Sequence, residues 1–231
     1  MTQKICLAAV IPTLNAASTL PTAIAALGPT AIAALGPVAE IMVADGGSTD
    51  GTPAVAVACG ATVTAAPRGR GSQMAAGIAA TTSPWVLLLH ADTRLQPGWR
   101  EAAAAHMDVQ PGKAAHFRLA LDSDDPQARR LERMVAWRCR VLGLPYGDQG
   151  LLIHRDLLAT VGGMRPLPLM EDVDLVARLG RRRLVGLDAI ALTSADKWQR
   201  DGWYRRSARN LCCLALWAAG VPPRWIVRLY G

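Results

Sequence analysis

The chain has 231 residues, 51% of them hydrophobic, so it can bury the core of one large α/β domain or of two small ones. Its formal net charge of +7 favours an anionic partner: a nucleotide, a phospholipid surface or a nucleic acid. The cysteines show no CxxC spacing, which argues against a disulfide or zinc framework and favours reduced thiols in a cytosolic protein (Cys6, Cys59, Cys139, Cys212 and Cys213).

Strand and helix patterns alternate through the first hundred residues. Short apolar runs predict strands over Ile5–Ile11, Glu40–Ala44, Thr62–Ala65 and Val86–Leu89. Helix-compatible segments follow the first three strands, over 15–27, 53–60 and 72–82. This alternation predicts an open, largely parallel α/β sheet, in which ligands bind at the carboxyl ends of the strands. The N-terminal apolar run is short and ends at Pro12, as in a first strand rather than a signal peptide.

The first helical segment contains a tandem repeat. The sequence TAIAALGP at Thr22–Pro29 recurs at once at Thr30–Pro37. Two copies are too few for a repeat architecture, so we expect two short helices, each ended by Gly-Pro and without chemical function.

The alternation weakens after residue 98. The pattern predicts a helix over 99–107, a strand over 113–121 and a basic helix with an acidic start over 122–143. A turn-rich region and a basic tail rich in tryptophan complete the chain. No low-complexity linker divides it, so we expect a single domain.

Polar side chains follow the predicted strands where each of them ends. Pro12 is expected to stop the ladder of the first strand. Asp45 follows the second strand, and Arg68 and Arg70 lie in a Gly-flanked loop after the third, suited to phosphate oxygens. His90-Ala91-Asp92 follows the fourth.

Two acids and two arginines therefore converge on one sheet edge, where they would suit a nucleotide diphosphate with a divalent metal. Each group also has a purely structural interpretation. Asp45 could cap a turn, Arg68 and Arg70 could lie in a solvated loop, and His90 and Asp92 could form a hydrogen-bonded pair.

Six segments recur, in this order, in the family 2 glycosyltransferases of GT-A fold: VIPTLN, IMVADGGSTDGT, RGRGSQM, LLLHADT, PYGDQG and MEDVDL. The chain resembles a short bacterial branch of that family with HADT, GDQG, MED and a late Ser-x-x-Arg/Lys-Trp, often labelled arsenosugar-biosynthesis glycosyltransferases. The resemblance runs from Val10 to about Tyr230 and implies a GT-A (Rossmann-like) α/β fold with a mixed, mostly parallel central sheet. It further implies a nucleotide-binding half over 1–98, an acceptor-side half over 99–200 and a basic helical tail over 201–231.

The resemblance also implies a donor site for a UDP-type nucleotide sugar. The positions that match this site are Pro12, Thr13, Leu14, Asn15, Asp45, Arg68, Arg70, Gln73, Ala91, Asp92 and Lys197. Asp92 matches the ligand of a Mn²⁺ or Mg²⁺ ion that bridges the pyrophosphate. His90 stands where the family has the first aspartate of its metal motif, and Lys197 where arginine is more usual.

On the acceptor side, Asp172 matches the general base and Glu171 its neighbour. An acceptor loop is implied at Asp148, Gln149 and Gly150, with Trp198 beside it. A carboxylate that takes the proton of a hydroxyl, opposite a metal-bound leaving diphosphate, implies direct displacement and therefore inversion.

Parts of the sequence are also compatible with two other functions. A sugar-phosphate nucleotidyltransferase would carry a Gly-rich loop after the first strand, whereas IPTLNA has no glycine. A nucleic-acid-binding module would use the positive charge, including Arg181–Arg183. We expect no nucleic-acid partner and an unidentified hydroxyl acceptor.

The apolar run Leu211–Val221 is too short to span a bilayer and is flanked by arginines and tryptophans. It suits packing on the sheet or on a second subunit, which we favour, or an interfacial anchor. The expected location is cytoplasmic, with peripheral contact to the inner face of the membrane as the alternative.

Overall fold

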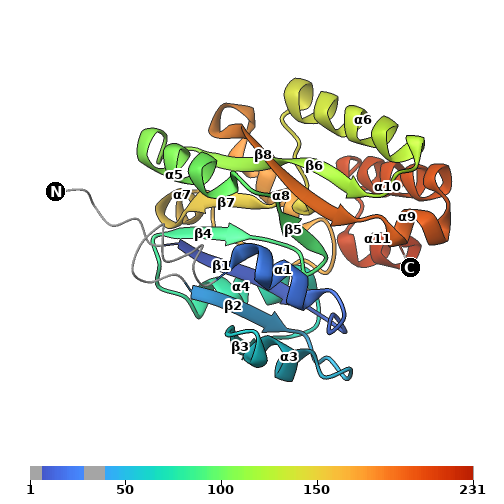
Figure 1. Cartoon of the computed structure of the whole chain (residues 1–231). Coiled ribbons are helices and arrows are strands. Elements are labelled where there is room, and N and C mark those ends of the chain that lie inside the picture. Colours follow the sequence, from blue (N-terminus) through green and yellow to red (C-terminus); the bar gives the residue numbers. More distant parts are fainter. Residues whose placement is uncertain (1–6, 29–39, 231) are drawn as a thin grey trace.

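A computed structural model describes residues 7–28 and 40–230, which form one mixed eight-stranded sheet with helices on both faces (Figure 1). The strand order is β3-β2-β1-β4-β7-β6-β8-β5. The strands are β1 (Leu7–Thr13), β2 (Glu40–Asp45), β3 (Thr62–Ala65), β4 (Trp85–Leu88), β5 (Thr93–Leu95), β6 (Ala114–Asp122), β7 (Leu151–His154) and β8 (Leu184–Ser194). Four neighbouring pairs are parallel and three antiparallel, so the predicted mixed, mostly parallel sheet is confirmed.

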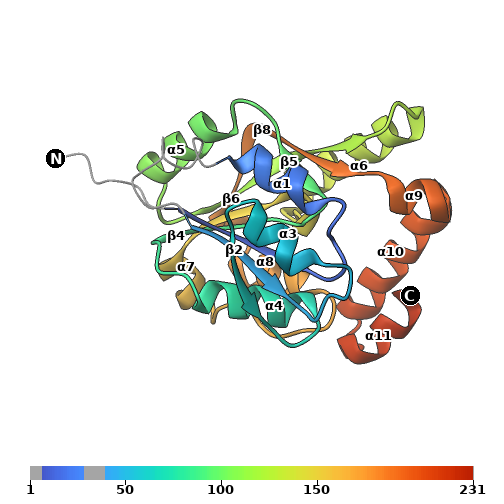
Figure 2. The ribbon, with the colours of Figure 1, turned by 60° about the horizontal axis from the view of Figure 1, so that its bottom comes forward.

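The helices divide between the two faces of the sheet (Figure 2). Those of one face are α1 (Leu20–Leu27), α3 (Thr52–Ala58) and α5 (Trp99–Val109); those of the other are α4 (Arg70–Ala79), α7 (Arg155–Thr160) and α8 (Glu171–Leu179). Each face has its own apolar core, one centred on Ile11 and Leu87 and the other on Val10 and Val86. Successive residues of a strand point to opposite faces, so these nearly all-apolar strands supply both cores.

The remaining helices lie toward the carboxyl ends of β1, β2 and β4. They are α6 (Pro126–Leu142), α9 (Asp196–Asp201), α10 (Trp203–Ala218) and α11 (Pro223–Tyr230), with two 3₁₀ turns, η1 (Gly147–Gln149) and η2 (Arg181–Arg183). The helix predicted over 122–143 begins where the Asp125 carboxylate accepts a hydrogen bond from the Gln127 N–H. Within the described ranges, no helix has the length and apolarity needed to cross a membrane.

Pro12 and the tandem repeat of the N-terminal half differ from prediction or lie partly outside the described residues. Pro12 does not stop the first strand, because β1 pairs with β2 as far as Thr13; only the ladder toward β4 ends earlier, at Val10. The first copy of the tandem repeat forms part of α1, which ends at Gly28 in a positive-φ conformation (57°). The second copy, Thr30–Pro37, lies outside the described residues.

Candidate active site

A pocket of about 560 Å³ opens beyond the carboxyl end of β4, between that strand and the C-terminal helices. Its charged floor is built from five separate segments of the chain. The ionisable groups of this floor are Arg70 at the start of α4, His90 and Asp92 after β4, Asp148 in η1, Asp172 at the start of α8 and Lys197 in α9. Strand ends and helix starts at this edge of the sheet bring together residues that are far apart in the sequence.

His90 is packed as a neutral imidazole. Its pKa falls to about 4, first because burial disfavours the charged form and then because Arg70 is near. The Nε2 atom is buried without a hydrogen-bond partner in the described part of the chain. The ring lies against Gly147, where an added Cβ would come within 2.5 Å of Nε2. Only glycine fits at this position of GDQG while His90 keeps its place.

Asp92 lies two residues beyond His90 and is paired with Lys197. Its carboxylate Oδ2 is 2.9 Å from Lys197 Nζ. Burial raises the pKa of Asp92, but the Lys197 ammonium group outweighs burial and holds the pKa below the ordinary value. Asp92 is therefore an anion beside a neutral imidazole, with a flexible ammonium group at its outer side.

Asp172, at the start of α8, accepts hydrogen bonds from two backbone amides, one in η1 and one in α8. Its Oδ2 accepts a hydrogen bond from the Gly147 N–H at 2.7 Å, and its Oδ1 accepts one from the Val173 N–H at 2.8 Å. The side chain lines the pocket, and its oxygens keep lone pairs for a further partner.

Glu171, by contrast, is fully buried and does not line this pocket. Its Oε1 lies 2.8 Å from Arg70 Nε, which ties the start of α8 to the start of α4. Burial, and then repulsion from Asp172, raise the pKa of Glu171 to about 7 despite Arg70. We therefore assign it a structural and electrostatic role beside Asp172 rather than contact with a substrate.

Asp148 occupies the middle of the floor. Its carbonyl accepts a hydrogen bond from Thr193 Oγ1 at 2.9 Å, which fixes η1 to β8. The carboxylate Oδ1 is buried without a partner among the described residues, and burial raises the pKa of Asp148 to about 6. A buried, unpartnered carboxyl oxygen that faces a pocket is suited to bind a donor group of a ligand.

The residues predicted at the ends of β1 and β2 form a rigid turn outside this pocket. Asp45 accepts hydrogen bonds from Thr13 Oγ1, from the backbone N–H groups of Gly47 and Ser48 and from Ser48 Oγ. Burial raises the pKa of Asp45, but these hydrogen bonds outweigh it and lower the pKa. Asn15 joins the same turn, since its Oδ1 accepts a hydrogen bond from the Thr49 N–H at 2.9 Å.

The other residues of this loop differ in exposure: Pro12 and Ala91 are buried, and Leu14 is half-buried. Pro12 lies within β1, Leu14 follows β1 and Ala91 follows β4, and these two strands are neighbours in the sheet. The donor-site positions of the N-terminal half thus share one sheet edge, but of these only Arg70 and Asp92 line the described pocket.

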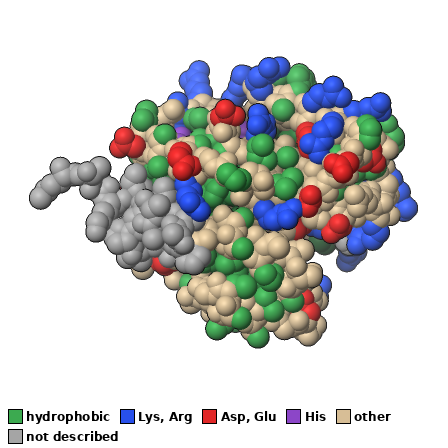
Figure 3. All heavy atoms as spheres, viewed as in Figure 1, with side chains coloured by type: hydrophobic (Ala, Val, Ile, Leu, Met, Phe, Trp, Pro, Cys, Tyr) green, Lys and Arg blue, Asp and Glu red, His purple; other side chains and the backbone are tan. Residues whose placement is uncertain are grey.

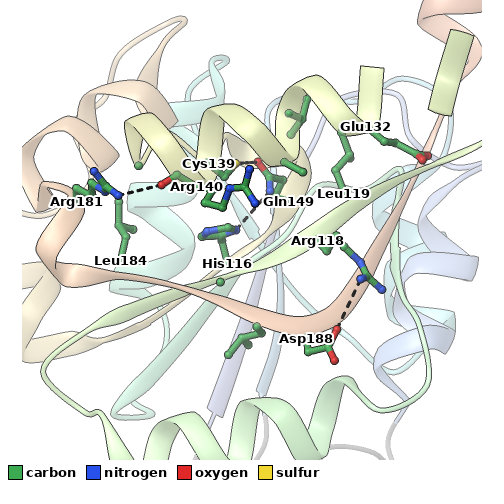
Figure 4. Close-up of a pocket in the computed structure, with 15 residues that line it drawn as sticks. His116, Arg118, Leu119, Glu132, Cys139, Arg140, Gln149, Arg181, Leu184 and Asp188 are labelled. Carbon is green, nitrogen blue, oxygen red and sulfur yellow. Dashed lines mark hydrogen bonds and ion pairs between the residues drawn. The ribbon is translucent and has the colours of Figure 1, made fainter. Parts of the chain in front are cut away.

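Two glutamines predicted to bind ligands are instead buried between elements. Gln73 Nε2 donates to the carbonyls of Thr13 and Ala44, which ties together the ends of β1 and β2. Gln149 Nε2 donates to the carbonyl of Phe117 at 3.0 Å. Figure 4 shows the Gln149 amide in a second pocket, of about 450 Å³, between β6, α6 and β8.

The structure also keeps two other predicted residues out of the first pocket. Arg68 is exposed and does not line it. Gly150 is buried with φ +63°, in van der Waals reach of Phe117, where it turns the chain into β7. Trp198 does line the pocket, and its ring stacks on Trp203 with 6.5 Å between centroids.

Sequence reasoning missed the wall above this floor. Arg138 places its guanidinium 3.6 Å from the centroid of the Tyr146 ring, and both residues line the pocket. Apolar side chains of α6 and α10, including Met134, Trp137 and Leu211, continue the wall outward. The spacing of Met134 and Trp137 is that of any helix face, so the sequence alone does not distinguish a pocket wall from a core.

The open sheet with both faces covered, and polar groups at the carboxyl ends of its strands, define an α/β protein of the class that binds ligands at this edge of the sheet. Residues 8–166 match the profile of glycosyl transferase family 2, and the chain belongs to that family. It is also 37% identical over 100 residues to uncharacterized glycosyltransferases of Mycobacterium bovis and Mycobacterium tuberculosis. That alignment covers 43% of this chain and 42% of the length of those relatives.

Solved structures of the same fold include two sugar transferases. The glucosyl-3-phosphoglycerate synthase of M. tuberculosis, crystallised with Mn²⁺, UDP and glucosyl-3-phosphoglycerate, is 20% identical with a TM-score of 0.59, over 94% of this chain and 80% of that one. The mannosyl-3-phosphoglycerate synthase of Rubrobacter xylanophilus is 20% identical with a TM-score of 0.59, over 94% of this chain and 75% of that one. This likeness confirms the predicted GT-A fold.

Proposed function

We propose that this chain is an inverting glycosyltransferase that moves a sugar from a UDP-type donor to a hydroxyl acceptor, with Asp172 as the general base. The observation that carries the proposal is the convergence of Asp92, His90 and Asp172 in one pocket, with Lys197 at its rim. Residues 1–98 would then bind the nucleotide and residues 99–200 the acceptor. The arsenosugar label of the resembling branch remains an untested prediction.

A divalent ion, Mn²⁺ or Mg²⁺, fits the residues present. Asp92 offers a carboxylate, and the unpartnered Nε2 of the neutral His90 imidazole is available as a second ligand. The described residues contain no group of three or more such ligands, so an ion held here would take its other ligands from the donor diphosphate and from water. When bound, the ion would act as a Lewis acid on the leaving phosphate.

Lys197 and Arg70 supply the remaining positive charge. The Lys197 ammonium group, half-exposed and 2.9 Å from Asp92, can shift from this carboxylate to a phosphate oxygen. Arg70 is fixed by Glu171, and its pKa is raised by the carboxylates around it despite burial, so it stays charged. Both side chains neutralise negative charge that develops on a departing diphosphate.

Asp172 takes the proton of the acceptor hydroxyl while the hydroxyl oxygen attacks the anomeric carbon of the donor sugar. The two backbone N–H groups that hold the carboxylate fix its direction. A positioned base of this kind contributes about 10²–10⁴-fold to the rate. Displacement from the side opposite the diphosphate inverts the anomeric configuration.

The donor class is tested by thermal stability with UDP, GDP, ADP and UDP-glucose, each with and without Mn²⁺. We expect UDP and UDP-glucose to raise Tm in a Mn²⁺-dependent manner, because a ligand that binds only the folded state stabilises it. Asp92→Ala should lose the Mn²⁺-dependent part of this shift. Asp188→Ala removes a carboxylate with 96% side-chain exposure and serves as the matched control.

Asp172→Asn separates catalysis from binding in the same assay. This variant should keep the UDP stabilisation but lose at least about 10²-fold in transfer or donor hydrolysis, because the asparagine amide cannot take up the proton of the acceptor hydroxyl. Full turnover by Asp172→Asn would reject Asp172 as the base. Retention on DNA without any nucleotide-dependent shift would instead support the nucleic-acid-binding alternative.

A further inference from the structure

The outer part of the pocket is a groove between α6 and α10 whose walls are largely apolar. Both helices contribute exposed hydrophobic side chains to it: Met134 is 58% exposed, Trp137 54% and Leu142 50% on α6, and Leu211 is 59% exposed on α10. Large apolar side chains left in water beside one another mark a binding surface.

The helix α6 is unusual in how little of it is buried. Only Ala128 and Val135 of its 17 residues are buried, against β6. The side of α6 that faces α10 thus presents apolar atoms that no other described residue covers. The two helices approach each other at one end, where the Arg130 and Tyr204 side chains meet at 3.5 Å. The groove is a gap between two elements, open to solvent and closed at its floor.

The floor of this groove is the proposed catalytic centre. The same cavity is lined by Asp92, Asp148 and Asp172 at its inner end and by Met134 and Leu211 farther out. A molecule that occupies the groove therefore places one end at the general base. The polar end of such a molecule meets carboxylates and arginines, and the rest of it meets hydrocarbon.

The charge around the groove restricts the kind of molecule further. Residues 203–230, which comprise α10 and α11, contain five arginines and neither aspartate nor glutamate. Arg206 and Arg209 are paired with Asp201, whereas Arg205, Arg224 and Arg228 are exposed. The helix α6 holds five arginines and a single glutamate, Glu132. An apolar groove with a cationic rim complements an amphiphile that is carried in an anionic lipid surface.

We propose that this groove binds the hydrocarbon chain of a lipid acceptor, whose hydroxyl then reaches Asp172. The assignment rests on the proposed function for the acceptor role, whereas the binding of the chain stands on the groove itself. A small polar acceptor would leave Met134, Trp137 and Leu211 in water, and nothing else in the described residues covers them.

The probe is a series of n-alkyl β-D-glucosides, from hexyl to decyl, below their micelle concentrations and titrated by calorimetry. We expect each added methylene to tighten binding about 3- to 4-fold. Met134→Glu and Leu211→Glu put a carboxylate in the groove and should weaken binding of the decyl compound at least 10-fold. Val57→Glu, at a residue of α3 that is 63% exposed, is the matched control and should bind as the native chain does.

Affinity that does not depend on chain length, or that Met134→Glu leaves unchanged, would overturn the proposal. Sedimentation tests whether a second copy fills the groove: a dimer that dissociates in Met134→Glu or on addition of decyl glucoside would also overturn it. UDP stabilisation, measured on the same variants, should persist. Its absence in the native chain, with chain-length dependence intact, would reject the donor assignment while supporting the apolar site.

Discussion

At the scale of single residues, the site combines acids in different environments. Asp92 is held as an anion by Lys197, whereas Glu171 and Asp148 are buried and have raised pKa values of about 7 and 6. Glu171, which is partly protonated near neutral pH because of its raised pKa, repels the neighbouring Asp172 less than a full negative charge would. The site therefore carries less negative charge than its number of acidic residues suggests.

The raised pKa of Glu171 gives a stability test with a definite sign. Between its ordinary pKa of 4.5 and about 7, the folded protein holds a proton that the unfolded chain has released, so stability falls as pH rises through this window. Glu171→Gln lacks this dependence. The free energy of unfolding of the native chain should therefore fall between pH 5 and pH 8 by roughly 3 kcal/mol more than that of Glu171→Gln.

Chemical denaturation at the two pH values measures this difference. Glu101→Gln, which changes an exposed glutamate of α5, is the control and should follow the native chain at both. Parallel pH profiles for Glu171→Gln and the native chain would mean that Glu171 is charged throughout.

The residue scale also shows what the sequence could not decide. Asp92, Asp172 and Lys197, which the motifs single out, line one pocket, because each follows a strand or begins a helix at the same sheet edge. The amides of Gln73 and Gln149 are satisfied by backbone carbonyls instead. An amide that binds a carbonyl and one that binds a ligand look alike in a sequence, since the difference depends on which segment packs beside it.

At the scale of elements, close approach between α4 and the sheet is set by Gly77. A Cβ added there would lie 2.5 Å from Val10 Cγ1 and 3.3 Å from Ala44 Cβ. Because α4 begins with Arg70, its distance from β1 and β2 also determines where that guanidinium meets Glu171. The helix was predictable from its apolar spacing, but this contact distance was not.

We expect Gly77→Ala to lower the free energy of unfolding by about 1–3 kcal/mol, because overpacking outweighs the gain in helix propensity. Gly112→Ala is the matched control: a Cβ there meets nothing within 4 Å. Urea denaturation of the two variants checks the contrast. Equal stability would show that α4 shifts outward without cost.

Elements of the second half were harder to predict than those of the first. The runs at β1, β2 and β4 are buried on both faces and read as unbroken apolar strands. By contrast, β8 contains Gly186 and Asp188 and pairs with β6 across an irregularity between His116 and Arg118. Its alternation is broken, so no single run marks it, and the short β5 is defined only by pairing with β8.

At the scale of the whole molecule, positive charge is unevenly distributed. Figure 3 shows lysine and arginine side chains gathered over α6 and the C-terminal helices, with few over the β2–β3–α3 part of the same face. The C-terminal segment does pack on the molecule, since Cys213 and Ile226 are buried against Leu169, Met170 and Val173. Packing and contact with a lipid surface are therefore compatible, because the buried and exposed sides of these helices differ.

This distribution predicts salt-sensitive binding to anionic membranes. Vesicles of phosphatidylglycerol and phosphatidylcholine should sediment the protein at low ionic strength, and vesicles of phosphatidylcholine alone should not. Each basic residue at the surface contributes about 1 kcal/mol, so Arg205→Glu on α10, which reverses one charge, should weaken binding about tenfold or more. Lys113→Glu makes the same change of charge at the turn after α5, away from the groove, and should bind nearly as the native chain does.

Raising the salt well above the physiological level should release the native protein, because exposed charges are then screened. Equal losses for Arg205→Glu and Lys113→Glu would show that net charge alone attracts the protein, with no preferred face toward the lipid.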